Sequence, residues 1–235
     1  MLTHRPLYLQ VYDLLTARIA GGAWKPGASL PNESDLAREL GVSAGTARKA
    51  LDMLEAGGLV VRRQGRGTFV LDQASREVSG RFDKLRGSNG ERLAYDVKVV
   101  EQGLHSPTEE EQAHLRVRPE EKILRTKRLQ TLRGQPFLFE VVAVAASRLP
   151  GLELGSLHDH PIATLAQRHG VHLTQGSENL SLAAATCEAA ASLCVEPGKM
   201  LLKLDRVLFS ADGHPVEWRL ALCNADTTCY LVTLS

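Results

Sequence analysis

The fold is decided by residues 31–70, which read PNESDLARELGVSAGTARKALDMLEAGGLVVRRQGRGTFV. Apolar residues recur at helical spacing on both sides of a connection of only three residues, Gly41-Val42-Ser43. Asn32 and Ser43 can each cap the helix that follows, and Gly41 can adopt the left-handed conformation that ends a helix. The stretch therefore predicts two short helices joined by a tight, glycine-containing turn, as in a helix-turn-helix.

A basic hairpin follows the second predicted helix. Gly57-Gly58 stops that helix. Residues 59–63 and 68–70 then predict two strands around the glycine-rich turn 64–67. Upstream, the apolar residues of the stretch 7–19 recur at helical spacing and predict one more helix. Each part alone is common, but three helices followed by a hairpin with a basic tip form the ordered series of a winged helix-turn-helix.

The front of the second helix can approach DNA closely. Ala44 and Gly45 are small, so the helix predicted from about residue 44 to residue 56 can enter a major groove. In the hairpin, glycine lets the turn backbone come close to DNA, and Arg66 can enter a minor groove. The ordinary alternative is a basic tip that is simply solvated. The expected DNA-contacting residues are Ser43, Thr46, Arg48, Lys49, Arg62, Gln64, Gly65, Arg66, Gly67 and Thr68.

The composition is that of a soluble globular protein and argues against a disordered chain. The 235 residues are 43% hydrophobic and 23% charged, with a formal net charge of +1. No apolar run approaches the roughly 20 residues that a membrane helix needs, so we expect no membrane partner and a cytoplasmic location. The overall charge does not indicate nucleic acid, but residues 56–71 hold three arginines and no acidic residue, which suits a modular DNA-binding protein.

The cysteine and histidine patterns predict neither a metal site nor a cofactor. His158-Asp159-His160 could suggest metal binding, but the segment is expected to be a loop and no third ligand has a suitable spacing. None of the four cysteines belongs to a C-x-x-C pair, so a zinc site is not expected. We expect reduced thiols buried in the core at Cys187, Cys194, Cys223 and Cys229.

The remainder of the chain contains an internal repeat. Each copy starts with a helix and continues with two strands, which predicts an α+β domain with one shared sheet. We expect the two halves of this sheet to face one another across a cleft that could hold a small ligand. Four residues recur 78 positions later: Leu115, Val117, Pro119 and Arg128 return as Leu193, Val195, Pro197 and Arg206. The predicted elements are 108–115, 123–129 and 136–144 in the first copy, and 187–193, 200–207 and 215–222 in the second.

Both halves of the chain resemble known families. Residues 7–70 resemble the winged helix-turn-helix of the GntR superfamily, on matching stretches such as Gly41-Val42-Ser43, Thr46-Ala47-Arg48 and Arg63–Val70. The rest resembles the UTRA effector-sensing domain of the HutC subfamily, whose fold is similar to that of chorismate lyase. That resemblance rests on the two repeat copies, on Arg128 and on Pro215-Val216-Glu217.

This resemblance implies the domain organisation of an α+β protein. We predict a winged helix-turn-helix DNA-binding domain over residues 1–72 and a linker over 73–80. A chorismate-lyase-like α+β sensing domain is predicted over residues 81–235.

The resemblance also implies a ligand-responsive transcriptional regulator, and more narrowly a repressor that a small-molecule effector releases from its operator. A homodimer would place two winged helices on the half-sites of a palindromic double-stranded DNA operator. Activation is the alternative sign of regulation. Two rival functions are a lyase-like enzyme, which turnover of a metabolite would favour, and an effector-independent architectural DNA-binding protein, which a thermal midpoint unmoved by a metabolite library would favour. The sequence holds no P-loop and no G-x-G-x-x-G motif, so we expect no enzyme.

The expected effector site follows from the same resemblance. In the sugar-phosphate sensors of this subfamily, one strand offers two arginines one residue apart, and here Arg128 fills the first position and Gln130 the second. One cation fewer weakens the grip on a dianionic phosphate, so we expect a small, polar, singly anionic metabolite. The ordinary alternatives are a sheet ion pair between Arg128 and Glu140 and a linker anchor at the start of the domain. The expected effector-binding residues are Arg81, Phe82, Arg128, Gln130, Glu140 and His160.

Overall fold

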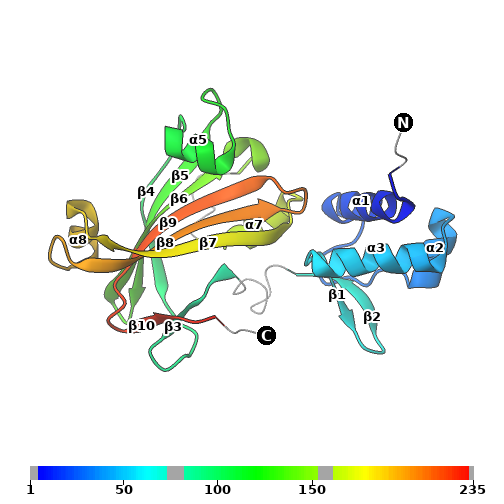
Figure 1. Cartoon of the computed structure of the whole chain (residues 1–235), viewed down its shortest axis with the longest axis horizontal. Helices are drawn as coiled ribbons and strands as arrows, with labels where there is room; N and C mark the ends of the chain where they lie inside the picture. Colours follow the sequence, from blue (N-terminus) through cyan, green and yellow to red (C-terminus); the bar gives the residue numbers. More distant parts are fainter. Residues whose placement is uncertain (1–4, 73–81, 153–160, 233–235) are drawn as a thin grey trace.

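The computed structural model describes residues 5–72, 82–152 and 161–232 (Figure 1). The N-terminal unit is mainly helical, and the C-terminal unit is built around a sheet. The predicted α+β class and the winged helix-turn-helix are confirmed. The elements of the N-terminal unit are α1 (Leu7–Ala20), α2 (Glu33–Leu40), α3 (Ala44–Ala56), β1 (Val60–Arg63) and β2 (Gly67–Val70).

The turn between α2 and α3 is fixed by one cap on each side. Asn32 Oδ1 accepts a hydrogen bond from the Asp35 amide at 2.9 Å, and Ser43 Oγ accepts one from the Thr46 amide at 3.1 Å. Between the caps, Gly41 has a φ of 66°, the left-handed conformation that ends α2. Because all three features are local, the turn forms from near neighbours in the sequence.

The three helices of the N-terminal unit share one apolar core. Leu15, Leu36 and Leu51, one from each helix, are fully buried in it. Ser29 forms an isolated β-bridge with Phe69, so the segment before α2 also contacts the hairpin. The hairpin is therefore fixed to the helices.

The C-terminal unit contains a six-stranded antiparallel sheet in the order β4-β5-β6-β9-β8-β7. The strands are β4 (Asp96–His105), β5 (Ile123–Leu132), β6 (Gln135–Ala145), β7 (Leu173–Ala184), β8 (Met200–Ser210) and β9 (Pro215–Cys223). A separate two-stranded pair is formed by β3 (Leu85–Gly87) and β10 (Thr228–Tyr230). The helices are α5 (Glu109–Leu115), α7 (Ile162–Arg168), α8 (Cys187–Leu193) and the short 3-10 helix η2 (Ala146–Arg148).

The two repeat copies are joined edge to edge. Strand β6 pairs with β9, with Val141 opposite Leu220, so the copies form two halves of one sheet. The expected shared sheet is confirmed. The expected cleft between facing halves is wrong, because the backbone pairing of the two hairpins holds the halves side by side. The polar residues of the repeat consequently lie on a face of the sheet.

Different elements cover the two faces of the sheet (Figure 1). On one face, α5 and α8 pack on apolar clusters that include Trp218 and Phe139. On the opposite face, α7 packs on a cluster with Val142 and Leu208, and the β3–β10 pair covers a cluster with Ala221. The middle of this second face lies between two apolar clusters and carries polar side chains.

Two of the four cysteines lie outside the core. Cys187 and Cys194 stand at the two ends of α8 and are exposed, so the expectation of buried thiols is wrong for both. The buried stripe of this seven-residue helix is made by Ala189, Ala190 and Leu193, whereas Cys187 at its start and Cys194 just after its end face solvent. Cys223 is buried, as expected, and Cys229 is partly buried.

Candidate functional site

The exposed front of α3 holds the helical residues that the sequence predicts to contact DNA. Ser43 and Lys49 are exposed, and Thr46 is half-buried because its hydroxyl meets Ser43 Oγ at 2.9 Å. The Arg48 side chain is 65% exposed, and its Nε donates a hydrogen bond to Glu33 Oε2 at 2.8 Å. The Lys49 ammonium lies 3.8 Å from the centre of the Tyr8 ring. The arginine is thus held at the helix surface, where it can exchange the half-buried Glu33 carboxylate for a DNA contact.

The tip of the β1–β2 hairpin is exposed from Gln64 to Gly67. Gly65 and Gly67 have φ values of 68° and 106°, which a residue with a side chain rarely adopts. Arg66 is exposed at this tip, and Thr68 is half-buried on β2. The structure therefore presents the glycine-rich turn to solvent with its basic side chain.

Arg62 differs from the other predicted DNA contacts. Its side chain is only 33% exposed and contacts Asp52 at 2.5 Å, Glu55 at 3.6 Å and Glu33 at 3.5 Å. Because Glu33 contacts both Arg62 and Arg48, the hairpin and α3 meet at this carboxylate. This geometry favours a role for Arg62 in anchoring the hairpin to α3.

The predicted effector residues of the first repeat copy come together on the polar face of the sheet. Arg128 and Glu140 are directly opposite each other on β5 and β6, and their charged groups are 2.7 Å apart. Gln130 Nε2 donates a hydrogen bond to Glu140 Oε1 at 3.1 Å. The Glu140 carboxylate is fully buried, which is costly for a charge unless it is paired.

The second repeat copy extends this arrangement with residues that sequence reasoning did not assign to the site. Arg219 lies 3.4 Å from Glu140 and 2.9 Å from Glu178, so it links the two halves of the sheet. Arg206 contacts Glu217 at 2.7 Å, and the Tyr230 hydroxyl donates a hydrogen bond to Glu178. Three arginines and three glutamates, called the charge cluster below, therefore lie together: Arg128, Glu140, Glu178, Arg206, Glu217 and Arg219.

Opposite charges favour the ionised forms of Glu140 and Arg219 despite their burial. Burial by itself would raise the pKa of Glu140, but Arg128 and Arg219 outweigh it, and the pKa of this carboxyl is lowered. Burial would lower the pKa of Arg219, but Glu140 and Glu178 raise it above its ordinary value. Burial and Glu178 both raise the pKa of Tyr230, so its hydroxyl stays protonated at neutral pH and can donate.

The charge cluster retains unused hydrogen-bonding capacity. Within the described residues, Arg206 Nε, Arg219 Nε and Glu217 Oε2 are buried and have no hydrogen-bond partner. Two of these atoms are donors and one is an acceptor. Buried polar atoms in folded proteins are nearly always paired with protein groups or with ordered water, so each of these three atoms can take one more polar partner.

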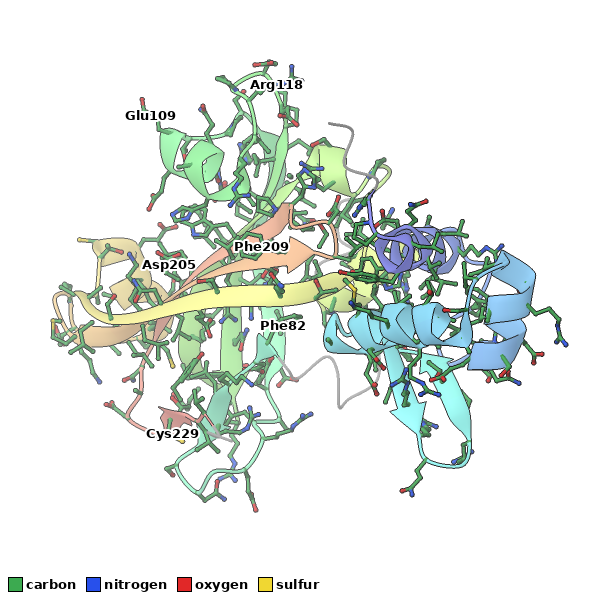
Figure 2. All side chains as sticks on the ribbon, turned by 45° about the vertical axis from the view of Figure 1, so that its right-hand side comes forward. Phe82, Glu109, Arg118, Asp205, Phe209 and Cys229 are labelled. Atoms are coloured by element: carbon green, nitrogen blue, oxygen red, sulfur yellow. The ribbon has the colours of Figure 1, made fainter. Side chains whose placement is uncertain are left out.

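Phe82 lies next to this cluster, beside β7 (Figure 2). Its carbonyl oxygen accepts a hydrogen bond from Arg206 at 2.6 Å. Its ring approaches Gly176, where a Cβ would lie 3.2 Å from it. The structure thus places one predicted effector residue against the second half of the sheet. Arg81, His160 and the predicted linker 73–80 lie outside the described residues.

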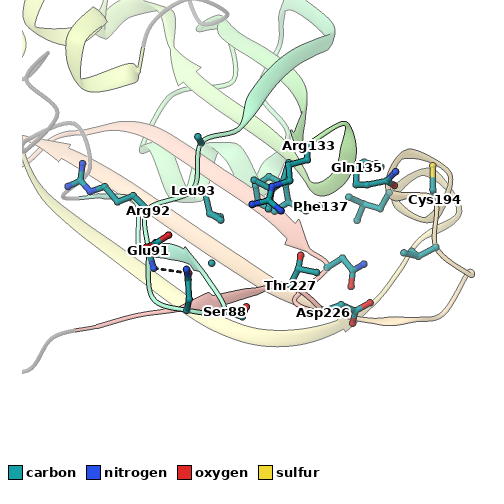
Figure 3. Close-up of a pocket in the computed structure, with 18 residues that line it drawn as sticks. Ser88, Glu91, Arg92, Leu93, Arg133, Gln135, Phe137, Cys194, Asp226 and Thr227 are labelled. Carbon is teal, nitrogen blue, oxygen red and sulfur yellow. Dashed lines mark hydrogen bonds between the residues drawn. The ribbon is translucent and has the colours of Figure 1, made fainter.

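A separate cavity of about 870 Å³ opens at one end of the sheet (Figure 3). Its wall combines Phe137 and Leu93 with the side chains of Arg92, Arg133 and Asp226. None of the described residues predicted to bind the effector lines it. It is therefore distinct from the charge cluster.

Neither a metal cluster nor a membrane-spanning helix occurs among the described residues. No three His, Cys, Asp or Glu side chains gather closely enough there to hold a metal ion. The His158-Asp159-His160 stretch lies outside this part of the chain. No described helix is long and apolar enough to cross a membrane.

Comparison with known proteins finds two families. Residues 90–228 match the UTRA domain, and residues 7–70 match the bacterial regulatory proteins of the gntR family. The chain is 30% identical to the histidine utilization repressor of Pseudomonas putida, over 87% of this chain and 83% of that protein. It is 29% identical to the HTH-type transcriptional regulator YurK of Bacillus subtilis (strain 168), over 97% of this chain and 95% of that protein.

Solved structures show the same fold. The crystal structure of PhnF from Mycobacterium smegmatis is similar with a TM-score of 0.58 and 23% identity, covering 96% of this chain and 99% of that one. The crystal structure of the "possible transcriptional regulator YydK" from Bacillus subtilis subsp. subtilis str. 168 gives a TM-score of 0.58 at 20% identity, covering 98% of this chain and all of that one.

The pairing of the buried Glu140 carboxylate predicts how the stability of the protein changes in acid. Glu140→Gln removes the anion between Arg128 and Arg219, so we expect it to lower the free energy of unfolding at pH 7 by about 3 kcal/mol or more. Because the pKa of Glu140 is lowered by folding, its contribution is present above the unfolded value of about 4.3 and is lost as the pH falls through the folded value. The loss in the variant should therefore shrink in acid.

Urea unfolding of both proteins at pH 7, 5 and 3.5 measures this difference. The control is Glu188→Gln, which removes an exposed carboxylate paired with Lys127 and should change stability by no more than about 1 kcal/mol. An equal loss for Glu140→Gln at pH 7 and pH 3.5 would contradict the ionised pairing of Glu140.

Proposed function

The chain is a transcriptional regulator of the GntR family with a UTRA domain, and we propose that it is a repressor that a small polar metabolite releases from its DNA operator. Relatives support this sign of regulation: one is named a histidine utilization repressor, and another is the HTH-type transcriptional repressor NagR of Bacillus subtilis, 26% identical over 94% of this chain and 91% of that protein. The observation that carries the proposal is the charge cluster, a buried ionic site on a sensing domain attached to a winged helix.

We propose that the chain binds DNA as a homodimer. Two winged helices would occupy the half-sites of a palindromic operator about one helical turn apart. The proposed division is a DNA-binding domain over residues 1–72, a linker over 73–80 and an effector-binding domain over 81–235, and the family matches over 7–70 and 90–228 support it. Binding of the effector would favour a dimer whose winged helices no longer match the half-site spacing, which requires a coupling of about 1–3 kcal/mol.

The charge balance of the cluster supports an effector with a single negative charge. Its three arginines are matched by its three glutamates, so it offers no excess of cations to a dianion. Gln130, which holds Glu140, is neutral where related sensors are expected to carry a second arginine. The unpaired Nε donors of Arg206 and Arg219 suit an anionic group, and the unpaired Glu217 oxygen suits a hydroxyl or amine. We therefore propose a ligand that carries both kinds of group and undergoes no turnover in this site.

A substitution of Arg48 tests the proposed DNA contact of α3. Arg48→Ala removes the exposed guanidinium from the front of α3, and we expect it to weaken specific binding by about 10-fold to 100-fold, because a bidentate contact to a base is lost. The measurement is a gel-shift titration on the duplex that the unsubstituted chain selects from a random-sequence pool. Arg118→Ala is the control: it removes the same charge from an exposed site on the C-terminal unit (Figure 2). Equal affinity of the two variants for that duplex would exclude Arg48 from the DNA contact.

A substitution of Arg128 tests the proposed effector site. A screen of amino acids, hydroxy acids and sugar phosphates first identifies a compound that releases the unsubstituted chain from its selected duplex, and we expect that compound to carry one negative charge. Arg128→Ala should then require at least about 10-fold more compound for release, since a buried charge-assisted contact is lost, while duplex affinity changes by no more than about twofold.

The matched control for this test is Arg125→Ala. Arg125 lies on the same strand, also contacts a buried glutamate, Glu111, at 2.7 Å, but does so on the opposite face of the sheet. This variant should respond to the compound as the parent does. Release of the Arg128→Ala variant at the parent's effector concentration would reduce Arg128 to a structural ion-pair member. Circular dichroism and melting of all three proteins separate loss of binding from misfolding.

A further inference from the structure

The C-terminal unit contacts the winged-helix unit through two turns. One follows α7 and leads into β7, and the other is the tip of the β8–β9 hairpin. Gln167 Nε2, at the end of α7, donates a hydrogen bond at 2.8 Å to the carbonyl oxygen of Leu71, just after β2. Ala211, at the hairpin tip, packs against the apolar core of the winged-helix unit. These contacts join residues far apart in the sequence.

Gly170 lies where the backbones of the two units come close together. It has a φ of +74°, and a Cβ placed on it would lie 2.9 Å from the carbonyl oxygen of Ala20, the last residue of α1. Backbone atoms cannot move aside as the end of a flexible side chain can. Glycine at this position therefore serves two purposes: it allows the left-handed turn after α7 and lets the end of α1 come close.

The two turns form one continuous surface. The Ala211 amide donates a hydrogen bond at 3.0 Å to the carbonyl oxygen of His172, which follows the Gly170 turn. His172 is buried within the C-terminal unit. Helix α7 in turn packs with Leu208 and Val216 of the same hairpin. A shift of the hairpin would therefore carry the whole surface with it.

The same hairpin holds half of the charge cluster. Arg206 lies on β8, and Glu217 and Arg219 lie on β9, a few residues from the tip that carries Ala211. The β8–β9 hairpin therefore connects these buried ion pairs with the surface that contacts the winged-helix unit. The two strands are paired from the charge cluster toward the tip, with one register shift between Leu208 and Phe209, so the hairpin connects the cluster to the tip.

We propose that Gln167, Gly170 and Ala211 form an intramolecular docking surface whose partner is the chain's own winged-helix unit, at the end of α1 and at Leu71. Docking there makes the two units one cooperative body in the free protein. The inference goes beyond the proposed function, because it concerns the chain without operator and without effector, and its test needs neither.

The two tryptophans of the chain allow each unit to be followed separately. Trp24 packs against the core of the winged-helix unit, and Trp218 is buried under α5 on the sheet. In the full chain, the Trp218→Phe background reports unfolding of the first unit by Trp24 fluorescence, and the Trp24→Phe background reports the second. Docked units should unfold together, so the urea midpoints of the two reporters should coincide.

Gly170→Ala should break this coincidence. Its Cβ meets the Ala20 carbonyl, so we expect the Trp24 midpoint to fall below the Trp218 midpoint by about 0.5 M urea or more. Gly134→Ala is the control: Gly134 has a φ of +78°, so alanine there brings similar backbone strain, but no atom lies within 4 Å of the added Cβ. In that variant the two midpoints should still coincide.

A second pair of variants removes a side chain without adding one. Gln167→Ala deletes the bond to Leu71 and should also separate the midpoints, whereas Gln112→Ala deletes a bond from Gln112 to Pro107 within the C-terminal unit and should not. Separate midpoints in the unsubstituted tryptophan backgrounds would overturn the proposal. Coincident midpoints in both Gly170→Ala and Gln167→Ala would overturn it as well.

Discussion

Strands β6 and β9 pair antiparallel across the middle of the sheet, and the ionic contact between the two repeat copies on the polar face depends on that pairing. The register places Glu140 opposite Ala221 and Val142 opposite Arg219. The small alanine leaves room beside Glu140, and Arg219 reaches it from the neighbouring row at 3.4 Å. A shift of one residue would turn Arg219 to the face covered by α5 and α8, because side chains alternate between the faces of a sheet. The two repeat copies would then lose their ionic link.

A cluster of this kind is a poor way to stabilise a fold. Taking charges out of water costs several kcal/mol per ion, and apolar residues of similar volume often stabilise a protein as well or better. The neighbouring regions of the same face are apolar around Val142 and Ala221, so the sheet itself does not require charge there. The proposed binding of a polar ligand would supply a physical reason for these six charged side chains, four of them buried, that stability does not.

The local features of the fold could be predicted from the sequence, whereas the relation between the repeat copies could not. Asn32, Gly41 and Ser43 act on residues within one turn of themselves, so the helix-turn-helix is encoded locally. The edge strands β4 and β7 were not predicted. Strand β7 is polar and exposed along most of its length and has no buried alternation, and β4, which starts with the alternating Asp96-Val97-Lys98-Val99, could have been found from that pattern.

For the candidate site too, the sequence predicted the local contacts but not the contacts between the repeat copies. Arg128 and Glu140 belong to one hairpin, and local pairing brings them together. Arg206 was visible as the repeat mate of Arg128, but its contact with Glu217 depends on a register shift between Leu208 and Phe209 that no sequence pattern marks. No sequence pattern indicated a role for Glu178, because it lies on strand β7, which was not predicted. The measurement that tests the effector site most directly is a crystal structure of the full chain after incubation with cell extract. We expect a bound small molecule within hydrogen-bond distance of Arg128 and of the unpaired atoms of Arg206, Arg219 or Glu217; a molecule bound instead only in the cavity beside Phe137 and Arg133 would contradict this site.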